Sequence, residues 1–323
     1  MEGSRTTGGR LLGRLISGLV TIVLVTLLVF LATRALPGDM ARIVLGRDAT
    51  TDAVAALHRE LGLDRPLASQ YLSWLGSVLT GDFGRSSVAH LPVLDLFAPR
   101  MLNTFTLVLL AMVVTIPLSI FLGLMTAFWR DGWLDRVVMA MSTGLNALPD
   151  FIVGMLLVVV FSTNVFHLLP AVSVMTPGEM PWRQPLALVL PCAVLAMLNS
   201  AYLYRLIRAS VIEVLGSEYV QMAMLKGLSS PRILFRHALP NAVVPAIQAM
   251  ANVFAFSVGS VVVLEYLFGF PGIGTGLTDA VANRDVPSVQ FVVLLIAFVF
   301  VLSNVVADVV TAWLTPHGRS LSR

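Results

Sequence analysis

The stretch 286–307, VPSVQFVVLLIAFVFVLSNVVA, contains no charged residue and ends immediately before Asp308. A helix needs roughly 20 apolar residues to cross a bilayer, and this stretch has that length. Lipid admits only helices and closed barrels, because every backbone polar group must be paired within the protein. The alternating strands of a barrel are absent, so the stretch predicts a transmembrane helix.

Further apolar stretches of spanning length precede it. They lie at 15–33, 101–129, 137–163 with a break at Pro149-Asp150, 184–204, and 241–264, which ends at Glu265. We therefore expect an all-α integral membrane protein with six transmembrane helices. Because Glu265 and Asp308 close two of the spans, their position favours carboxylates that lie at headgroup level or face water over carboxylates on an ion pathway.

The composition supports this fold class. The 323 residues are 57% hydrophobic and 12% charged, whereas a soluble domain has about 25% charged residues. Most of the exterior must face membrane lipid, which excludes an ordinary soluble enzyme and a disordered chain. The net charge of +3 comes without a basic stripe, so no nucleic-acid partner is expected. Cys192 is the only cysteine, so we expect neither a disulfide nor a cysteine-rich metal site.

The basic residues predict the orientation of the spans. The cytoplasmic segments, assigned by the excess of arginine in short loops, are 1–14, 129–136, 205–240 and 315–323. Both termini are then cytoplasmic. The first span has Arg10 and Arg14 before it, as a signal peptide would, but its apolar core is too long and Ala32-Thr33-Arg34-Ala35 is a poor cleavage site. We expect a retained span.

The expected organisation is one membrane domain with two large excursions. In order these parts are a cytoplasmic segment 1–14, a first transmembrane helix 15–35, an extracytoplasmic loop 36–100, a five-helix core 101–315 that contains the cytoplasmic loop 205–240, and a cytoplasmic tail 316–323. The outer loop has a helical segment near 50–62. Its mixed charge leaves two interpretations, a cap over the span ends or a dock for another protein.

The cytoplasmic loop 205–240 reads RLIRASVIEVLGSEYVQMAMLKGLSSPRILFRHALP. Ser217 can cap a helix that opens at Glu218, and Lys226 with Gly227 ends it. Ser230 and Pro231 then begin a second helix. The short helix 218–226 is rich in apolar side chains, which either pack on the membrane domain and headgroups or fit a groove in another protein.

The loop resembles a known motif. Glu218, Ala223, Gly227 and Leu239-Pro240 are similar to the EAA loop of ATP-binding-cassette importer permeases, with Tyr219-Val220 in place of the usual two alanines, as in the peptide-permease branch. Further matches to the first membrane subunit of dipeptide and oligopeptide permeases are Leu61-Gly62-Leu63-Asp64-Arg65-Pro66, Gln70-Tyr71, Gly81-Asp82-Phe83-Gly84, Leu148-Pro149-Asp150-Phe151, Leu169-Pro170-Ala171, Phe268-Gly269-Phe270-Pro271-Gly272-Ile273-Gly274, Asn283-Arg284-Asp285-Val286-Pro287 and Gln290.

The resemblance implies a type I importer permease in the inner membrane of a prokaryote. The expected partners are a homologous second permease, two ATPase subunits, an extracytoplasmic substrate-binding protein and membrane lipid. In that family the loop couples the membrane domain to the ATPases. The corresponding residues of this chain are Ser217, Glu218, Tyr219, Ala223, Lys226, Gly227, Leu228 and Ser229. The implied cargo is peptide, with nickel, glutathione or oligosaccharide as alternatives.

Catalytic chemistry is not expected in this chain. Its only lysine, Lys226, lacks the upstream glycines of a phosphate-binding loop, so ATP and Mg²⁺ would be bound by the partner ATPases. The histidines form no His-Glu-x-x-His zinc site, and we expect no catalytic residue, resident cofactor or metal. An intramembrane aspartyl protease would need two aspartates that approach each other within the membrane. Asp150 and Asp308 are the candidates, but their positions near a helix break and a span end argue against this role. A channel or secondary transporter is the alternative of a different class.

Polar residues within the spans mark a possible pathway. For most of them, hydrogen bonding between helices is the simpler role. Asn146, Asn252 and Ser257, in the third and fifth spans, are the candidates to line a cavity.

Overall fold

The computed structural model describes residues 7–35, 50–60, 64–176, 179–228 and 239–314. Its helices are α1 (Thr7–Ala35), α3 (Thr51–Glu60), α4 (Leu67–Leu79), α5 (Val93–Phe128), α6 (Trp133–Ala147), α7 (Asp150–Val158), α8 (Pro185–Leu215), α9 (Glu218–Leu225), α11 (Leu239–Phe268), α12 (Ile273–Ala282) and α13 (Val286–Leu314). A π-helical turn, Val159–Thr163, extends α7. No strand occurs in the described ranges, as the all-α prediction requires.

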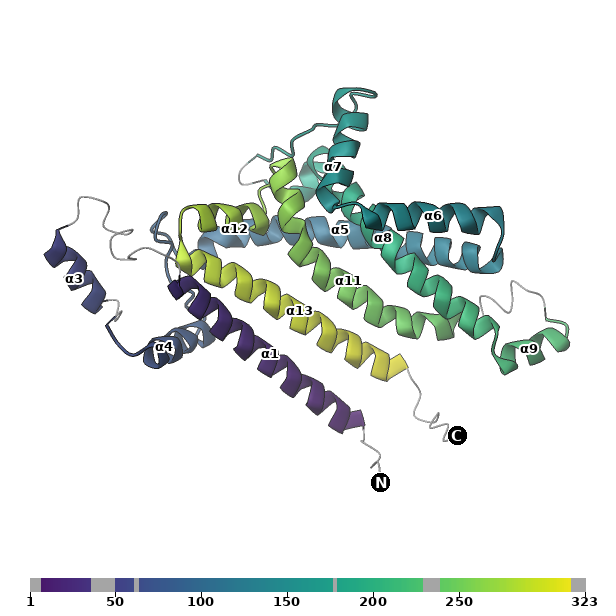
Figure 1. Cartoon of the computed structure of the whole chain (residues 1–323), viewed down its shortest axis with the longest axis horizontal. Helices are drawn as coiled ribbons and strands as arrows, with labels where there is room; N and C mark the ends of the chain where they lie inside the picture. The colour runs from purple at the N-terminus through teal and green to yellow at the C-terminus, as the bar shows by residue number, and fades with distance from the viewer. Residues whose placement is uncertain (1–6, 36–49, 61–63, 177–178, 229–238, 315–323) are drawn as a thin grey trace.

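Four long helices form the core. α5 packs closely along α8, α11 lies between α8 and α13, and α1 packs on the outer side of α13 (Figure 1). Each core helix contributes an apolar side chain with no exposed surface to one continuous cluster, and examples from α5, α8, α11 and α13 are Leu107, Val194, Val258 and Val292. α1 runs antiparallel to α13, since Gly18 meets Val301 and Thr33 accepts a hydrogen bond from Gln290.

The transmembrane prediction agrees with the helices. Within the described residues five helices are long and apolar enough to cross a membrane, and α6 with α7 makes a sixth if the bent pair is one span. The pair bends by 106°. The break falls at Leu148 and Pro149, where the sequence predicts an interruption, because proline disfavours helical conformation in the residue before it.

Glu265 and Asp308 lie near the ends of their apolar segments, as the sequence predicts, but neither carboxylate faces water. Glu265 lies within the apolar segment Ala246–Phe268 of α11 and is 0% exposed, and Asp308 lies within Val286–Thr311 of α13 and is 8% exposed. Both carboxylates accept hydrogen bonds from other helices, Glu265 from Thr104 and Asp308 from Gln248. These partners offset the cost of burying a carboxylate in the last turn of each apolar segment.

Two expected boundaries shift. α5 begins at Val93, inside the segment assigned to the outer loop, because Val93 and Phe97 lie one helical turn apart and are both buried in the main core. α1 begins at Thr7, before the expected start of the span. The helix expected near 50–62 is present as α3, whereas the helix expected after Ser230 lies outside the described residues.

Candidate functional site

α9 is a short helix joined to the end of α8 by Gly216 and Ser217. Ser217 occupies the N-cap position with extended backbone angles (φ −72°, ψ 151°). Its hydroxyl donates to the carbonyl of Val214 at 2.5 Å and makes no capping bond to α9, so the predicted side-chain cap is wrong although its position is right. Glu218 stands in the first turn, where its negative charge suits the helix dipole.

The end of α9 matches the predicted glycine geometry. Gly227 has φ +76°, the left-handed region that disfavours a Cβ atom. Its N–H donates to Met224 at 2.9 Å, and the Leu228 N–H donates to Ala223 at 3.3 Å, a pair of bonds that closes the last turn after the C-cap residue Lys226. The glycine therefore sets the direction in which the chain leaves the helix. Ser229 lies outside the described residues.

The side chains of α9 divide between two faces. Val220 and Ala223 are buried, and Val214, Leu215 and Leu228 pack against them. The other face exposes large side chains, of which Leu225 is 83% exposed; its members are Tyr219, Met222, Met224 and Leu225. The helix thus packs on its own membrane domain through one face and exposes these large side chains on the other, where Glu218 and Gln221 are also exposed. We call the second set the outward face of α9.

An ion pair about two turns before the end of α8 ties that helix to the start of α6. The Arg208 guanidinium donates to both carboxylate oxygens of Asp135, with Nε–Oδ1 and Nη2–Oδ2 distances of 2.7 Å each. Oδ2 also accepts the backbone N–H of Asp131 at 3.0 Å. Asp135 is 4% exposed, so this bidentate contact is well shielded from water. It links the helix that carries α9 to the α5–α6 connection.

Removal of this carboxylate should destabilise the chain strongly. Asp135→Ala leaves the Arg208 guanidinium half-enclosed without its partner, a change that costs about 3–5 kcal/mol for a buried ion pair. Thermal unfolding of the purified chain in detergent measures the effect, with Arg136→Ala, an exposed neighbour on α6, as the control. Equal unfolding temperatures for the two variants would show that the pair contributes nothing to stability.

A polar cavity of about 300 Å³ lies at the bend between α6 and α7. Asn146, Asp150 and Asn199 supply its polar wall, while its other lining residues are Leu148, Leu198, Tyr202, Val253 and Phe256. Asn199 donates to the Ser257 hydroxyl at 2.8 Å. Of the three expected pathway residues, Asn146 lines the cavity and Ser257 binds the lining residue Asn199. Asn252 is half-buried and lies on the same face of α11 as the lining residue Phe256.

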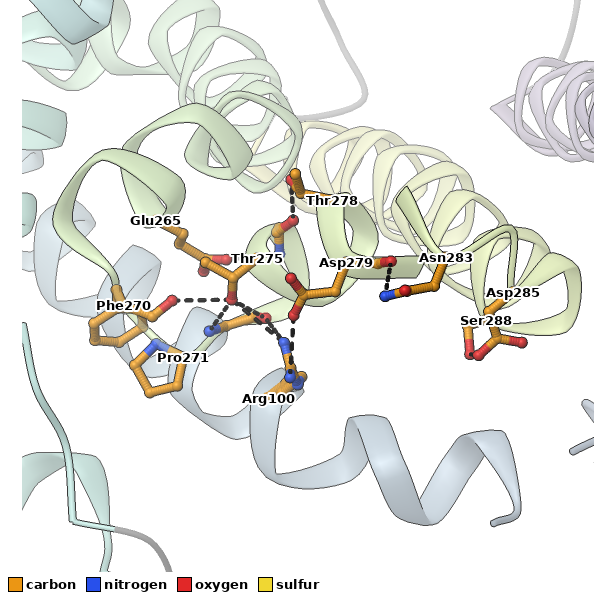
Figure 2. A network of polar contacts seen from close by, with 12 residues as sticks. Arg100, Glu265, Phe270, Pro271, Thr275, Thr278, Asp279, Asn283, Asp285 and Ser288 are labelled. Atoms are coloured by element: carbon orange, nitrogen blue, oxygen red, sulfur yellow. Dashed lines mark hydrogen bonds and ion pairs between the residues drawn. The ribbon is translucent and has the colours of Figure 1, made fainter. Parts of the chain in front are cut away.

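A polar network joins α5 to the turn between α11 and α12, and Figure 2 shows its rim, where Arg100 of α5 lies against Thr275 and Asp279. Glu265 accepts the Thr104 hydroxyl at 2.6 Å through Oε1 and the Gly274 N–H at 2.6 Å through Oε2. Thr104 in turn accepts the Ile273 N–H at 2.9 Å. Asn103 on the same turn of α5 donates to the Pro271 carbonyl at 2.8 Å. These bonds hold the N-terminus of α12 against α5.

Glycines make this network possible. A Cβ atom on Gly272 would overlap the Glu265 carboxylate, and one on Gly274 would overlap the backbone of Val262. At the rim, Arg100 forms an ion pair with Asp279 of α12 at 3.6 Å. The Phe268–Gly274 motif of the sequence therefore builds a close contact between α11 and α12.

A second carboxylate fastens the residues before α5 to the start of α13. Asp285 is buried and accepts the hydroxyls of Ser86 at 2.5 Å and Ser288 at 2.7 Å, together with the Ser87 N–H at 2.9 Å. Asp285 therefore ties residues 86–87, before α5, to the connection between α12 and α13.

The sequence alone missed the long-range members of these sites. Asp135 and Arg208, Thr104 and Glu265, and Ser86 and Asp285 are each separated by many residues. Their only local signal is a charged or polar residue inside an apolar segment or next to a glycine motif. Among the described residues no group of three His, Cys, Asp or Glu side chains is placed to hold a metal ion.

Comparison with known proteins identifies the family. Residues 119–320 match the family described as binding-protein-dependent transport system inner membrane component, and residues 10–122 match its N-terminal counterpart. A probable peptide ABC transporter permease protein, y4tP of Sinorhizobium fredii (strain NBRC 101917 / NGR234), is 35% identical over 97% of this chain and 99% of the relative. The glutathione transport system permease protein GsiC of Escherichia coli (strain K12) is 35% identical over 95% and 97%, and that of Salmonella typhi 36% over 95% and 98%. With its apolar helices arranged as described, this chain is a multi-pass inner-membrane protein that belongs to the family of binding-protein-dependent transport system inner membrane components.

Proposed function

We propose that this chain is the permease subunit of an ATP-driven peptide importer, in which it forms half of the translocation pathway. The observation that carries the proposal is the outward face of α9, an apolar surface held in fixed geometry at the end of a long core helix. Relatives named for peptide and glutathione transport share about a third of its residues over nearly their whole length. Glutathione is itself a peptide and is the second candidate cargo.

The outward face of α9 is proposed to seat in a groove of an ATPase subunit. Two such subunits would bind ATP and Mg²⁺, since this chain has no phosphate-binding loop. Closure of the ATPases would move the segment 217–230, and α8 would carry that motion to the membrane core. The Arg208–Asp135 pair supports this role, because it makes α6 follow α8.

A homologous second permease is proposed to complete the pathway. α7 projects away from the helix bundle (Figure 1) and exposes Phe151, Met155 and Leu156. The cavity lined by Asn146, Asp150 and Asn199 lies at the base of this projection, where two subunits would enclose it. An extracytoplasmic binding protein would deliver the cargo to the opposite end of the complex from α9.

Reconstitution tests the proposed function. The chain is assembled in proteoliposomes with candidate ATPase, second-permease and binding-protein subunits, and the binding protein is loaded with dipeptides, longer peptides, glutathione, nickel or oligosaccharide. We expect peptide-loaded binding protein to stimulate both ATP hydrolysis and uptake. Uptake driven by an ion gradient without ATP would instead establish a secondary transporter.

The polar cavity gives a second test. Asn146→Trp fills the space at the bend of α6 and should remove most uptake, while the ATPases still assemble with the membrane subunits. Met141→Trp adds the same side chain at an exposed position of α6 and is the control. Unchanged uptake in the Asn146 variant would place the pathway elsewhere.

A further inference from the structure

α4 (Leu67–Leu79) is an apolar helix with an unusual position. Its sequence, LASQYLSWLGSVL, contains no charged residue. All of its residues are described, and none is buried. An apolar helix without burial requires a covering surface, because exposure of large aliphatic side chains to water is unfavourable.

α4 packs on α1 through an aromatic cluster. The Phe30 ring lies 5.5 Å from the Tyr71 ring and 6.0 Å from the Trp74 ring, measured between centroids. The hydroxyls of Tyr71 and Thr26 are hydrogen-bonded at 2.9 Å, and Thr26 is 1% exposed. These contacts fix the level of α4 along the first span.

That level lies inside the apolar part of α1. The apolar segment of α1 is Ile16–Thr33. Thr26 precedes Thr33 by seven residues, which at 1.5 Å per residue is about 10 Å. The Tyr71 contact is therefore deeper than the end of the span, where lipid rather than water surrounds α1. Beside it, α1 exposes Leu24 and Leu28, the surface through which this helix would face lipid.

The apolar arc of α4 is wider than its contact with α1. Ala68, Leu72 and Leu79 lie on one stripe at helical spacing, next to the stripe of Tyr71 and Trp74. Leu72 is 65% exposed and Leu79 is 80% exposed. The small polar residues occupy the other side of the helix: Ser69, Ser73, Gly76 and Thr80. The uncovered stripe continues the lipid-facing surface of α1.

We propose that α4 is an interfacial membrane helix, with Leu72 and Leu79 inserted among the acyl chains and Ser69 and Ser73 directed to water. The lack of charge in α4 predicts insertion into zwitterionic lipid without a requirement for anionic headgroups. The outer excursion is thereby anchored to the membrane beside the first span.

Nitroxide labels on the full chain test the proposal. Leu72→Cys, Leu79→Cys and the matched Ser73→Cys are made with Cys192→Ser, which removes the only native cysteine. The labelled chain is placed in phosphatidylcholine nanodiscs and exposed to oxygen and to a water-soluble nickel chelate. We expect oxygen to dominate relaxation of the labels at 72 and 79, at depths of about 5–10 Å, and the chelate to dominate at 73.

Three outcomes overturn the proposal. Access of the nickel chelate to the labels at both 72 and 79 would leave this face open to a soluble partner, such as a binding protein. Protection of both labels from oxygen and chelate alike would mean that protein covers the stripe. If the labels at 72 and 79 enter the membrane only after anionic lipid is added, apolar contact alone does not drive the insertion of α4, which would also contradict the proposal.

Discussion

Gly274→Ala is expected to separate α12 from α11 and to destabilise the folded chain. The new Cβ atom would overlap the backbone of Val262, which cannot rotate away as a side chain could, and would also press on the Glu265 carboxylate. Overpacking that shifts the backbone costs about 1–3 kcal/mol, and occasionally more. The displaced N-terminus of α12 would also lose the hydrogen bond from the Gly274 N–H to Glu265.

The measurement is thermal unfolding followed by a thiol-reactive fluorophore. The only native thiol, Cys192, lies in α8 against the main core and becomes reactive as the helices separate. Gly144→Ala is the matched control, because a Cβ atom there meets nothing within 4 Å and alanine favours the helix. A Gly274 variant as stable as the Gly144 variant would mean that the close contact of α11 and α12 has no energetic role.

Leu225→Asp is expected to abolish coupling between ATP hydrolysis and uptake. Leu225 is the most exposed member of the outward face of α9, so its replacement leaves the fold of this chain intact. A buried charge at the centre of a protein contact costs about 2–4 kcal/mol, which weakens association more than tenfold. Peptide-stimulated ATP hydrolysis and uptake in proteoliposomes measure the loss, and Leu225→Met is the control that keeps the apolar surface.

Gly227→Val tests the same assignment through the backbone. Valine resists the positive φ of this position, so α9 would end in a different direction and lose its alignment with an ATPase. Gly227→Asn, which tolerates the left-handed conformation, should retain more activity. If both Leu225→Asp and Gly227→Val transport normally, α9 is not the coupling element.

Local chemistry was sufficient to predict much of the loop that carries α9. Gly227 ends the helix because a positive-φ position depends on the local backbone, and Ser217 takes the N-cap position although its hydroxyl does not cap α9. Which face of α9 stays uncovered could not be predicted, because it depends on tertiary contacts. The end of α8 and Leu228 cover Val220 and Ala223, and this leaves the opposite face exposed. The pathway candidates Asn146 and Ser257 remain predictions, supported by their place in and beside the polar cavity.

Hydropathy was a poor guide where a charged side chain has a buried partner. Scanning along the chain ends a span at Glu265 or Asp308, since an isolated carboxylate is costly in lipid. Thr104 on another helix and the Gly274 N–H lower that cost for Glu265, and Gln248 does so for Asp308. Such partners cannot be read from a window of neighbouring residues.

The sequence alone specified a helical membrane protein, its main spans, the break at Pro149 and the short helix that ends at Gly227. These features depend on composition, periodicity and local backbone preferences, which act over a few residues. The packing of helices decided which polar groups meet, as in Arg208 with Asp135, and which apolar surfaces stay uncovered, as in Leu225. Those outcomes depend on residues far apart in the chain, because burial and hydrogen bonding are settled only when whole helices come into contact.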